Sequence, residues 1–269
     1  MISDNKSAAA RALGVSRSSL YYQPLLPDKD WQLKCQIEAV LEQHRDYGYR
    51  RVAQALTMNK KPVQRVMQQF GIKAYRRRGR KQRRRAKTIQ VVYPNLLREV
   101  MPTYPGHIWV SDFTYLPWRT GFVYLATVMD LFTREVVGWS VMTRHGAALT
   151  LQALFVALLY HSRPAIFHSD NGREYDAKAF VGALTEVGTD ISRITPGCPW
   201  ENGYQESFYS RFKTSLGDTQ RFKTLGELVS AVYQELHRYN KSRIHSALLM
   251  SPVQFRQQYL REKSRVMSV

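Results

Sequence analysis

Apolar residues in the first quarter of the chain recur at helical spacing. They fall every three or four positions over residues 31–41, which predicts an amphipathic helix. A second short helix is predicted over residues 47–56. A third is predicted over residues 61–70, because Asn59 can cap its start and Gly71 can end it. Three short helices rich in arginine and lysine favour a small DNA-binding domain; a helical domain that contacts only protein is the alternative.

A shorter helical pattern stands near the start of the chain. Residues 8–13 can form a small-residue helix, Gly14 a turn, and Ser16 the cap of a second helix that carries Arg17. This order is typical of the last two helices of a helix-turn-helix, whose second helix lies in the major groove of DNA. We therefore expect a partial helix-turn-helix over residues 1–24, with Arg17 contacting DNA. A frayed amphipathic helix is the alternative.

From residue 104 onward the pattern becomes that of an α/β domain. Strands are predicted over residues 109–116, 122–129, 135–141, 165–167 and 190–194. Helices are predicted over residues 147–160, 177–187, 203–216 and 225–239. Hairpin strands followed by a helix and further strands favour a mixed sheet with flanking helices.

The composition is that of a folded protein with a polyanionic partner. The chain has 269 residues, 44% of them hydrophobic, which excludes wholesale disorder. Lys and Arg number 40 against 21 Asp and Glu, so the net charge is +19. Nucleic acid is the commonest polyanion that such a charge binds, and a ribosomal or membrane-surface protein is the alternative.

The sequence contains no pattern for a membrane span or a secretion signal. No stretch reaches the roughly 18–20 apolar residues that a span needs, and the residues after Met1 are polar. Cys35 and Cys198 stand far apart, without the spacing of a zinc site or of a disulfide framework. We therefore expect a cytoplasmic protein with no membrane partner.

The most biased stretch is Tyr75 to Lys87, which reads YRRRGRKQRRRAK. Like charges at this density cannot pack against one another, so an exposed basic linker is predicted over residues 75–103. Bound to DNA, it would displace counterions from the phosphates and make the affinity steeply dependent on salt. The residues expected to contact DNA here are Arg76, Arg77, Arg78, Arg80, Arg83, Arg84 and Arg85.

Three acidic residues stand where a catalytic site could form. Asp112 lies inside the first predicted strand among apolar or small residues, where an ionised side chain is costly unless it has a partner. Asp170 follows a short apolar strand, and the Asn171-Gly172 pair after it predicts a tight turn. Glu206 lies within a predicted helix. The competing acids are Glu201, Glu174 and Asp130.

If the fold brings these acids together, their negative charges need cations between them. An all-oxygen set of ligands suits Mg²⁺ or Mn²⁺. Two such ions about 4 Å apart would activate a water or a DNA 3′-hydroxyl and stabilise the leaving oxygen of a phosphodiester. The acids therefore predict metal-dependent phosphoryl transfer, in which the protein mainly positions the phosphate.

The spacing of the acids and the residues around them resemble a known family. Between Asp170 and Glu206 lie 35 residues. The matching motifs are Trp109-Val-Ser-Asp-Phe-Thr-Tyr115, Asp130-Leu-Phe-Thr-Arg134, His168-Ser-Asp-Asn-Gly172, Asn202-Gly-Tyr-Gln-Glu-Ser-Phe208 and residues 240–252. Over nearly its whole length the chain resembles the OrfB transposases of the IS-three family of bacterial insertion sequences. It departs from them at Glu201-Asn-Gly, where the family has Asp-Asn-Ala, so a contribution of Glu201 stays open.

The resemblance implies a fold and a domain order. The catalytic core is expected over residues 104–223 as a ribonuclease-H-like α/β domain similar to retroviral integrases, with a five-stranded mixed sheet and flanking helices. Small all-α helix-turn-helix segments precede it, including an integrase-associated helical DNA-binding domain over residues 28–74. A C-terminal helical segment is expected over residues 224–269.

The resemblance also implies an activity and its partners. Asp112, Asp170 and Glu206 would hold two Mg²⁺ or Mn²⁺ ions and catalyse 3′-end cleavage and strand transfer. Lys213 would hold element-end DNA, since seven positions after Glu206 is two helical turns on the same face. Further DNA contacts are expected from Arg50, Arg51, Arg243 and His245.

The expected partners are element-end and target DNA, the upstream-frame OrfA product as a separate or fused chain, and further copies of this protein on the DNA. The expected location is the bacterial cytoplasm, in association with the nucleoid. Two other functions remain open: a ribonuclease-H-type metal nuclease that never joins strands, and a DNA-binding regulator with an inactive core.

Overall fold

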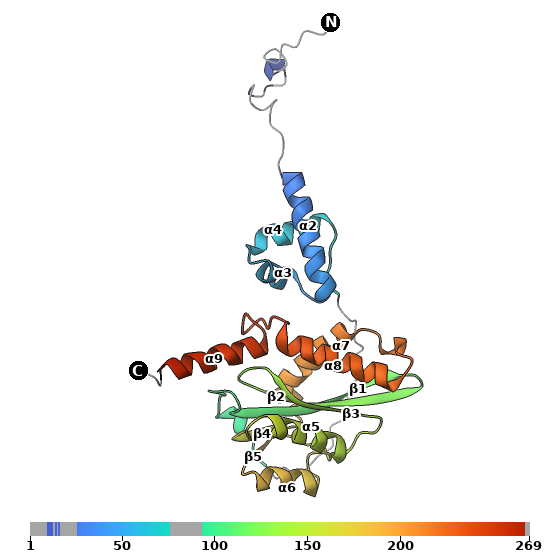
Figure 1. Ribbon diagram of the computed structural model, residues 1–269, viewed down its shortest axis with the longest axis vertical. Coiled ribbons are helices and arrows are strands. Elements are labelled where there is room, and N and C mark those ends of the chain that lie inside the picture. The colour runs from blue at the N-terminus through green and yellow to red at the C-terminus, as the bar shows by residue number, and fades with distance from the viewer. Residues whose placement is uncertain (1–9, 13, 15, 17–25, 76–92, 267–269) are drawn as a thin grey trace. The chain divides into compact units, whose positions relative to one another are not determined.

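The computed structural model describes residues 10–12, 14, 16, 26–75 and 93–266, which fall into two compact units (Figure 1). The smaller unit contains the residues up to 73 except 44–46, and the larger unit contains residues 44–46 together with those from 74 onward. Arg17 and the arginines of the predicted basic linker lie outside the described residues.

Helices α2 (Leu26–Gln43), α3 (Tyr49–Ala55) and α4 (Lys60–Gln69) form the smaller unit, as predicted. Their apolar faces meet in a core that includes the fully buried Ile37 and Val63. The Asn59 side chain caps α4 by accepting the N–H of Lys61 at 3.0 Å. Gly71 follows α4 with φ of 65°, a conformation that favours glycine at a helix end.

The larger unit is built on one five-stranded sheet. Its strands are β1 (Ile108–Trp118), β2 (Gly121–Asp130), β3 (Val136–Met142), β4 (Ile166–Ser169) and β5 (Asp190–Arg193). Their order in the sheet is β3-β2-β1-β4-β5. The first three strands pair antiparallel, whereas β4 pairs parallel with both β1 and β5. The predicted mixed sheet is therefore confirmed.

Helices cover both faces of this sheet (Figure 1). Helices α7 (Gly203–Leu216) and α8 (Leu225–Lys241) pack on one face, and α5 (Ala147–Tyr160) and α6 (Lys178–Glu186) on the other. Helix α9 (Pro252–Val266) contacts α8. The shorter helices are η2 (Leu96–Arg98), η3 (Pro199–Asn202) and η4 (Thr219–Arg221).

Strand β1 has one apolar cluster on each side. Ile108 and Val110 join the cluster that contains the apolar residues of α7 and α8. Trp109 joins the cluster on the α5 and α6 side. Because successive strand residues point to opposite faces, Asp112 lies on the same face as Val110, toward α7.

Helix α5 approaches β3 closely at Gly138. A Cβ atom at this position would stand 2.7 Å from the Cβ of Ala157 and 2.8 Å from its backbone nitrogen. We expect Gly138→Ala to lower the free energy of unfolding by about 1–3 kcal/mol, because helix backbone cannot yield as a side chain can. Urea denaturation measures this, with Gly182→Ala, where no atom lies within 4 Å of the added Cβ, as the control. Equal stability of both variants would contradict this close packing.

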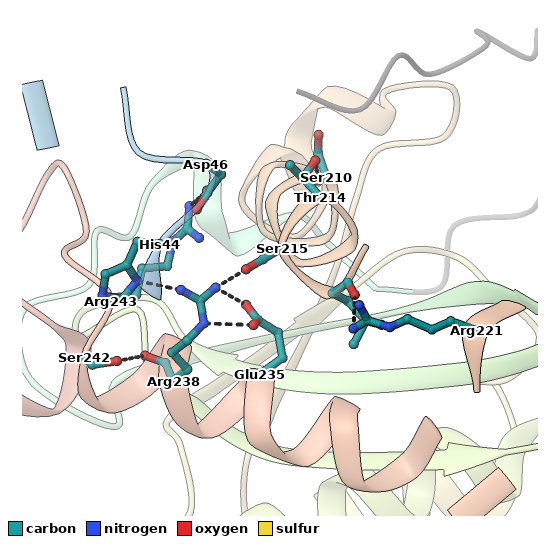
Figure 2. Close-up of polar contacts among 11 residues, drawn as sticks. His44, Asp46, Ser210, Thr214, Ser215, Arg221, Glu235, Arg238, Ser242 and Arg243 are labelled. Carbon is teal, nitrogen blue, oxygen red and sulfur yellow. Dashed lines mark hydrogen bonds and ion pairs between the residues drawn. The ribbon is translucent and has the colours of Figure 1, made fainter. Parts of the chain in front are cut away.

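A polar network holds residues 44–46 against α8 within the larger unit (Figure 2). Arg238 donates to Nδ1 of His44 at 2.5 Å and to the two carboxylate oxygens of Glu235 at 2.7 and 2.9 Å. Arg243 is 3% exposed and forms an ion pair with Asp46. The sequence predicted a DNA contact for Arg243. In the structure its guanidinium is paired with a carboxylate far away in the sequence, and its contact with DNA stays a prediction.

The same network makes stability depend on pH. Burial, with the neighbouring Arg238 and Arg243, lowers the pKa of His44 to about 4, and Asp46 opposes this shift. The unfolded chain protonates this ring near pH 6.5, so the stability contributed by the neutral ring is complete above that pH and is lost as the pH falls toward 4. After allowance for solvent screening, we expect a loss of about 1–3 kcal/mol between pH 7 and 4.5.

The variant His44→Asn tests this expectation, because its side chain keeps an acceptor for Arg238 but does not titrate. Urea denaturation at pH 7, 5.5 and 4.5 should show a smaller loss of stability for His44→Asn than for the unchanged protein. The control is His237→Asn, at an exposed position of α8. If His44→Asn and the unchanged protein lose stability in parallel, His44 is not the group responsible.

Candidate active site

Two of the three predicted acids lie on β1 and just after β4, which are neighbours at the centre of the sheet. These strands run parallel with Val110 opposite His168, the last pair of their register. Asp112 and Asp170 each stand two residues further along, so the same register, continued, would bring them close together. Parallel strands are about 4.8 Å apart. Strand β4 ends at Ser169, so Asp170 is the first residue beyond it, where a side chain opens into a site.

The hydroxyl of Tyr175 is affected by both carboxylates. It lies 3.0 Å from Oγ of Ser111, the residue before Asp112. Burial raises the pKa of Tyr175 well above its usual value, and the negative charges of Asp112 and Asp170 raise it further. The charges of Asp112 and Asp170 both act on this buried hydroxyl, so they lie in the same region. Negative charge concentrated in this way favours the binding of a cation.

The turn after β4 fixes the position of Asp170. The backbone N–H of Gly172 donates to Oδ1 of Asp170 at 3.0 Å, and the Asn171 side chain donates to the carbonyl of Ile194 at 2.7 Å. The same Oδ1 and Oε2 of Glu174 both lie within 3.0 Å of the point where a Cβ on Gly172 would stand. The predicted turn is therefore present, and a side chain at position 172 would collide with these oxygens.

Helix α7 brings the third acid to this end of β1. Gln205 donates to the carbonyl of Val110 at 2.8 Å, and the Tyr209 hydroxyl donates to the carbonyl of Asp112 at 2.5 Å. Glu206 lies between these two anchors in the first turns of α7, with its side chain exposed. Within residues 26–75 and 93–266, no three His, Cys, Asp or Glu side chains are grouped closely enough to hold a metal ion. Asp112, Asp170 and Glu206 are therefore not gathered into a metal site in this structure, and Glu206 is exposed on the helix that packs across β1.

The competing acids have structural partners. Glu201 accepts the N–H of Thr195 at 2.7 Å and pairs with Arg98 at 2.8 Å. Burial raises the pKa of Glu201, but the hydrogen bonds from Thr195 and Arg98 outweigh it and lower the pKa overall. Asp130 accepts backbone N–H groups of the turn after β2, and Glu174 pairs with His145 at 3.1 Å. These contacts favour Glu206 over Glu201 as the third acid.

The residues predicted to bind DNA lie in different settings. Lys213 stands 4.6 Å above the ring of the exposed Tyr115, beside the site on α7. Arg50 is exposed, and Arg51 stacks on Tyr47 at 5.7 Å, both in the smaller unit. His245 lines a pocket at the start of α7.

Tyr175 and Gln205 stood out in the sequence only as parts of the motifs around Asp170 and Glu206, and Tyr209 did not stand out; no role in assembling the site was predicted for any of them. Gln205 is fully buried, and Tyr209 is 5% exposed. A weak signal existed for Tyr209, because it stands three positions after Glu206 and therefore near the same helix face. No comparable signal in the sequence links Gln205 to strand β1.

No helix in the described part of the chain has both the length and the hydropathy that a membrane crossing requires.

Two models of known protein families match the part of the chain that contains this site. The model of the integrase core domain family matches residues 102–199, and a second integrase core domain model matches residues 187–252. Together with the sheet order, these matches confirm the predicted ribonuclease-H-like α/β core.

Several similar proteins come from bacterial insertion sequences. The transposase for insertion sequence element IS904 of Lactococcus lactis is 31% identical over 222 residues, which cover 79% of this chain and 88% of that protein. Transposase InsF for insertion sequence IS3fB of Escherichia coli is 34% identical over 160 residues, 58% of this chain and 56% of that protein. Among solved structures, the HTLV-2 integrase catalytic core domain has a TM-score of 0.49 and 20% identity, and covers 58% of this chain.

Proposed function

Because this chain belongs to the insertion-sequence transposases with an integrase core domain, we propose that it cleaves the ends of its own element and joins them to DNA. Asp112, Asp170 and Glu206 are the proposed catalytic residues. The observations that support this proposal are the parallel register of β1 and β4, which ends two residues before Asp112 and Asp170, and the hydrogen bonds that fix α7, the helix of Glu206, on the backbone of β1.

The donor set fits divalent cations. All three proposed ligands are carboxylates, which suit Mg²⁺ or Mn²⁺. The pKa of the buried Tyr175 hydroxyl is raised first by burial and then by the charges of Asp112 and Asp170, which supports a negatively charged site. We propose two ions per site; when bound, they would supply an activated nucleophile and a charge that stabilises the leaving oxygen.

The chain's own residues would position the reactants. Gln205 and Tyr209 hold α7 against the backbone of β1, and the turn at Gly172 holds the Asp170 carboxylate. Lys213, two turns along α7 from Glu206, would hold a phosphate of the element end near the acids. These positioning roles agree with phosphoryl transfer, in which positioning and electrostatics supply most of the catalysis.

The proposed partners follow from this activity. They are element-end and target DNA, further copies of the chain assembled on that DNA, and the upstream-frame OrfA product. The arginines at positions 50 and 51 and those of the basic linker would add contacts to DNA phosphates. We place this activity in the bacterial cytoplasm, at the nucleoid.

The test is a joining assay with the purified full chain, a labelled duplex carrying the element end, and Mg²⁺. We expect 3′-end cleavage and a joined product, with more product when the upstream-frame partner is added. Release of nicked DNA with no joined product from a pre-cut end would favour a nuclease. No cleavage under any of these conditions, with tight DNA binding, would favour a DNA-binding regulator.

Lys213→Ala should lower joining of a pre-cut end by about tenfold at ~0.1 M salt, since it removes one phosphate contact. The matched control is Lys223→Ala, at an exposed position beyond the end of α7. Activation by Mg²⁺ should stay unchanged in both variants. Normal joining by Lys213→Ala would remove this lysine from the proposed site.

A further inference from the structure

The pocket that His245 lines lies at the start of α7. It has a volume of about 190 Å³ and lies between the turn after β2, the first turns of α7 and the loop after α8. Arg134, Arg211 and His245 line it, together with Tyr204 and Ser207. Tyr204, Ser207 and Arg211 stand three and four positions apart and therefore share one face of α7.

Arg134 is held in place by its backbone and by an aromatic ring. Its φ is 63°, a conformation that costs energy for a residue other than glycine. Its guanidinium lies 4.2 Å from the centre of the Tyr204 ring. Its Nη1 is buried and has no hydrogen-bond partner in the described part of the chain. A strained, desolvated arginine of this kind indicates a functional site more than a stabilising contact.

The acids nearest to Arg134 in the sequence are already occupied. Asp130 accepts the N–H groups of Phe132 and Thr133, and Glu135 pairs with Arg256 at 2.7 Å. Neither Arg134 nor Arg211 forms an ion pair with a carboxylate among the described residues. Two arginines therefore line one small pocket without a negative charge to balance them.

Other features of the pocket add to this positive potential. Helix α7 begins here, and its N-cap residue, Asn202, makes no capping hydrogen bond through its side chain. The helix dipole therefore favours an anion on this side, although the N–H of Gly203 is bonded to the carbonyl of Trp200. Nδ1 of His245 accepts the N–H of Ala247 at 3.3 Å, which fixes the orientation of the ring in the pocket wall.

We propose that this pocket binds a phosphate of the DNA backbone. Arg211 and Arg134 are the donors, and Tyr204 keeps the Arg134 guanidinium in position. The inference deepens the proposed function and rests on it for the identity of the anion. Paired guanidinium groups match phosphate oxygens well, and the pocket has room for a phosphate and its sugar.

The test measures DNA binding by the full chain, with no divalent ion and in an Asp170→Asn background, so that cleavage plays no part. Arg134→Asn keeps a residue that tolerates positive φ, and Arg211→Gln changes the second donor. Arg261→Gln, at an exposed position of α9, removes the same charge elsewhere and is the control. Dissociation constants are measured from 50 to 300 mM KCl on an element-end duplex and on an unrelated duplex.

Each pocket variant should bind about tenfold more weakly than the control at ~0.1 M salt, and its slope of log affinity against log salt should fall by about one. Loss on both duplexes supports a contact made with any DNA, and loss on one duplex identifies which DNA enters the pocket. Affinities and slopes equal to those of Arg261→Gln would overturn the inference. If Arg134→Asn fails to fold, Arg211→Gln decides alone.

This outcome is separate from that of the proposed function. Failure of the unchanged protein to cleave element ends would contradict the proposed function without altering the salt measurements. Normal cleavage together with unaltered binding by both pocket variants would contradict the pocket alone. Single methylphosphonate substitutions along the duplex then locate the contact: one position should weaken the unchanged protein but not Arg211→Gln.

Discussion

Asparagine in place of Asp112 or Asp170 should reduce element-end cleavage and joining by about 10³-fold or more, with DNA binding retained. The substitution keeps the size of the side chain but removes the charge that a divalent cation needs. Because both residues stand two positions beyond the last β1–β4 pair, Val110 and His168, either change should have the same effect. Single-turnover cleavage of a labelled element-end duplex measures it.

Glu206→Gln should cause a loss of the same order, and Glu201→Gln is its matched control five positions away. Glu201 pairs with Arg98 and accepts the N–H of Thr195, so its loss should cost stability more than rate. We expect Glu201→Gln to cleave within about fivefold of the unchanged protein, since most losses in this variant act through folding. If Glu201→Gln lost far more cleavage than Glu206→Gln, Glu201 would be the third acid. Undiminished cleavage by Asp112→Asn, Asp170→Asn and Glu206→Gln would contradict the proposed site.

The helices and strands could be predicted from the sequence because each has a strong local pattern. The alternation around Val110 and the apolar run before Asp170 mark β1 and β4 without any knowledge of the fold. Asp112 and Asp170 stood out because a carboxylate inside or just after a buried strand needs a reason. The turn at Gly172 could be predicted for the same local reason.

Pairings between distant residues could not be predicted in this way. The register of β1 against β4, which ends two residues before the two aspartates, depends on the whole sheet. The ion pair of Arg243 with Asp46 joins residues almost two hundred positions apart, so no local pattern could predict it. The outward direction of Glu206 is also invisible to periodicity, because its neighbour Gln205 is the buried residue.

The cleavage reaction should also be sensitive to a single methyl group at Gly172. A Cβ there would stand 2.9 Å from Oδ1 of Asp170 and 3.0 Å from Oε2 of Glu174. Both atoms are ends of side chains and can swing away, so Gly172→Ala should fold with little loss of stability. The carboxylate of Asp170 must then leave its position. A displacement of about 1 Å in an active site can cost roughly 10²-fold in rate.

The measurement is single-turnover cleavage over a range of Mg²⁺ concentrations, with urea denaturation alongside. We expect Gly172→Ala to cleave about 10²-fold more slowly at low Mg²⁺ and to need more Mg²⁺ for half-maximal rate, because one ligand is displaced. Gly182→Ala, where the added Cβ meets no atom within 4 Å, should cleave at the normal rate and gain up to about 1 kcal/mol from its better helix propensity. Normal cleavage and an unchanged Mg²⁺ requirement in Gly172→Ala would show that the position of the Asp170 carboxylate does not limit the reaction, and Asp170 would then lose its place as a metal ligand.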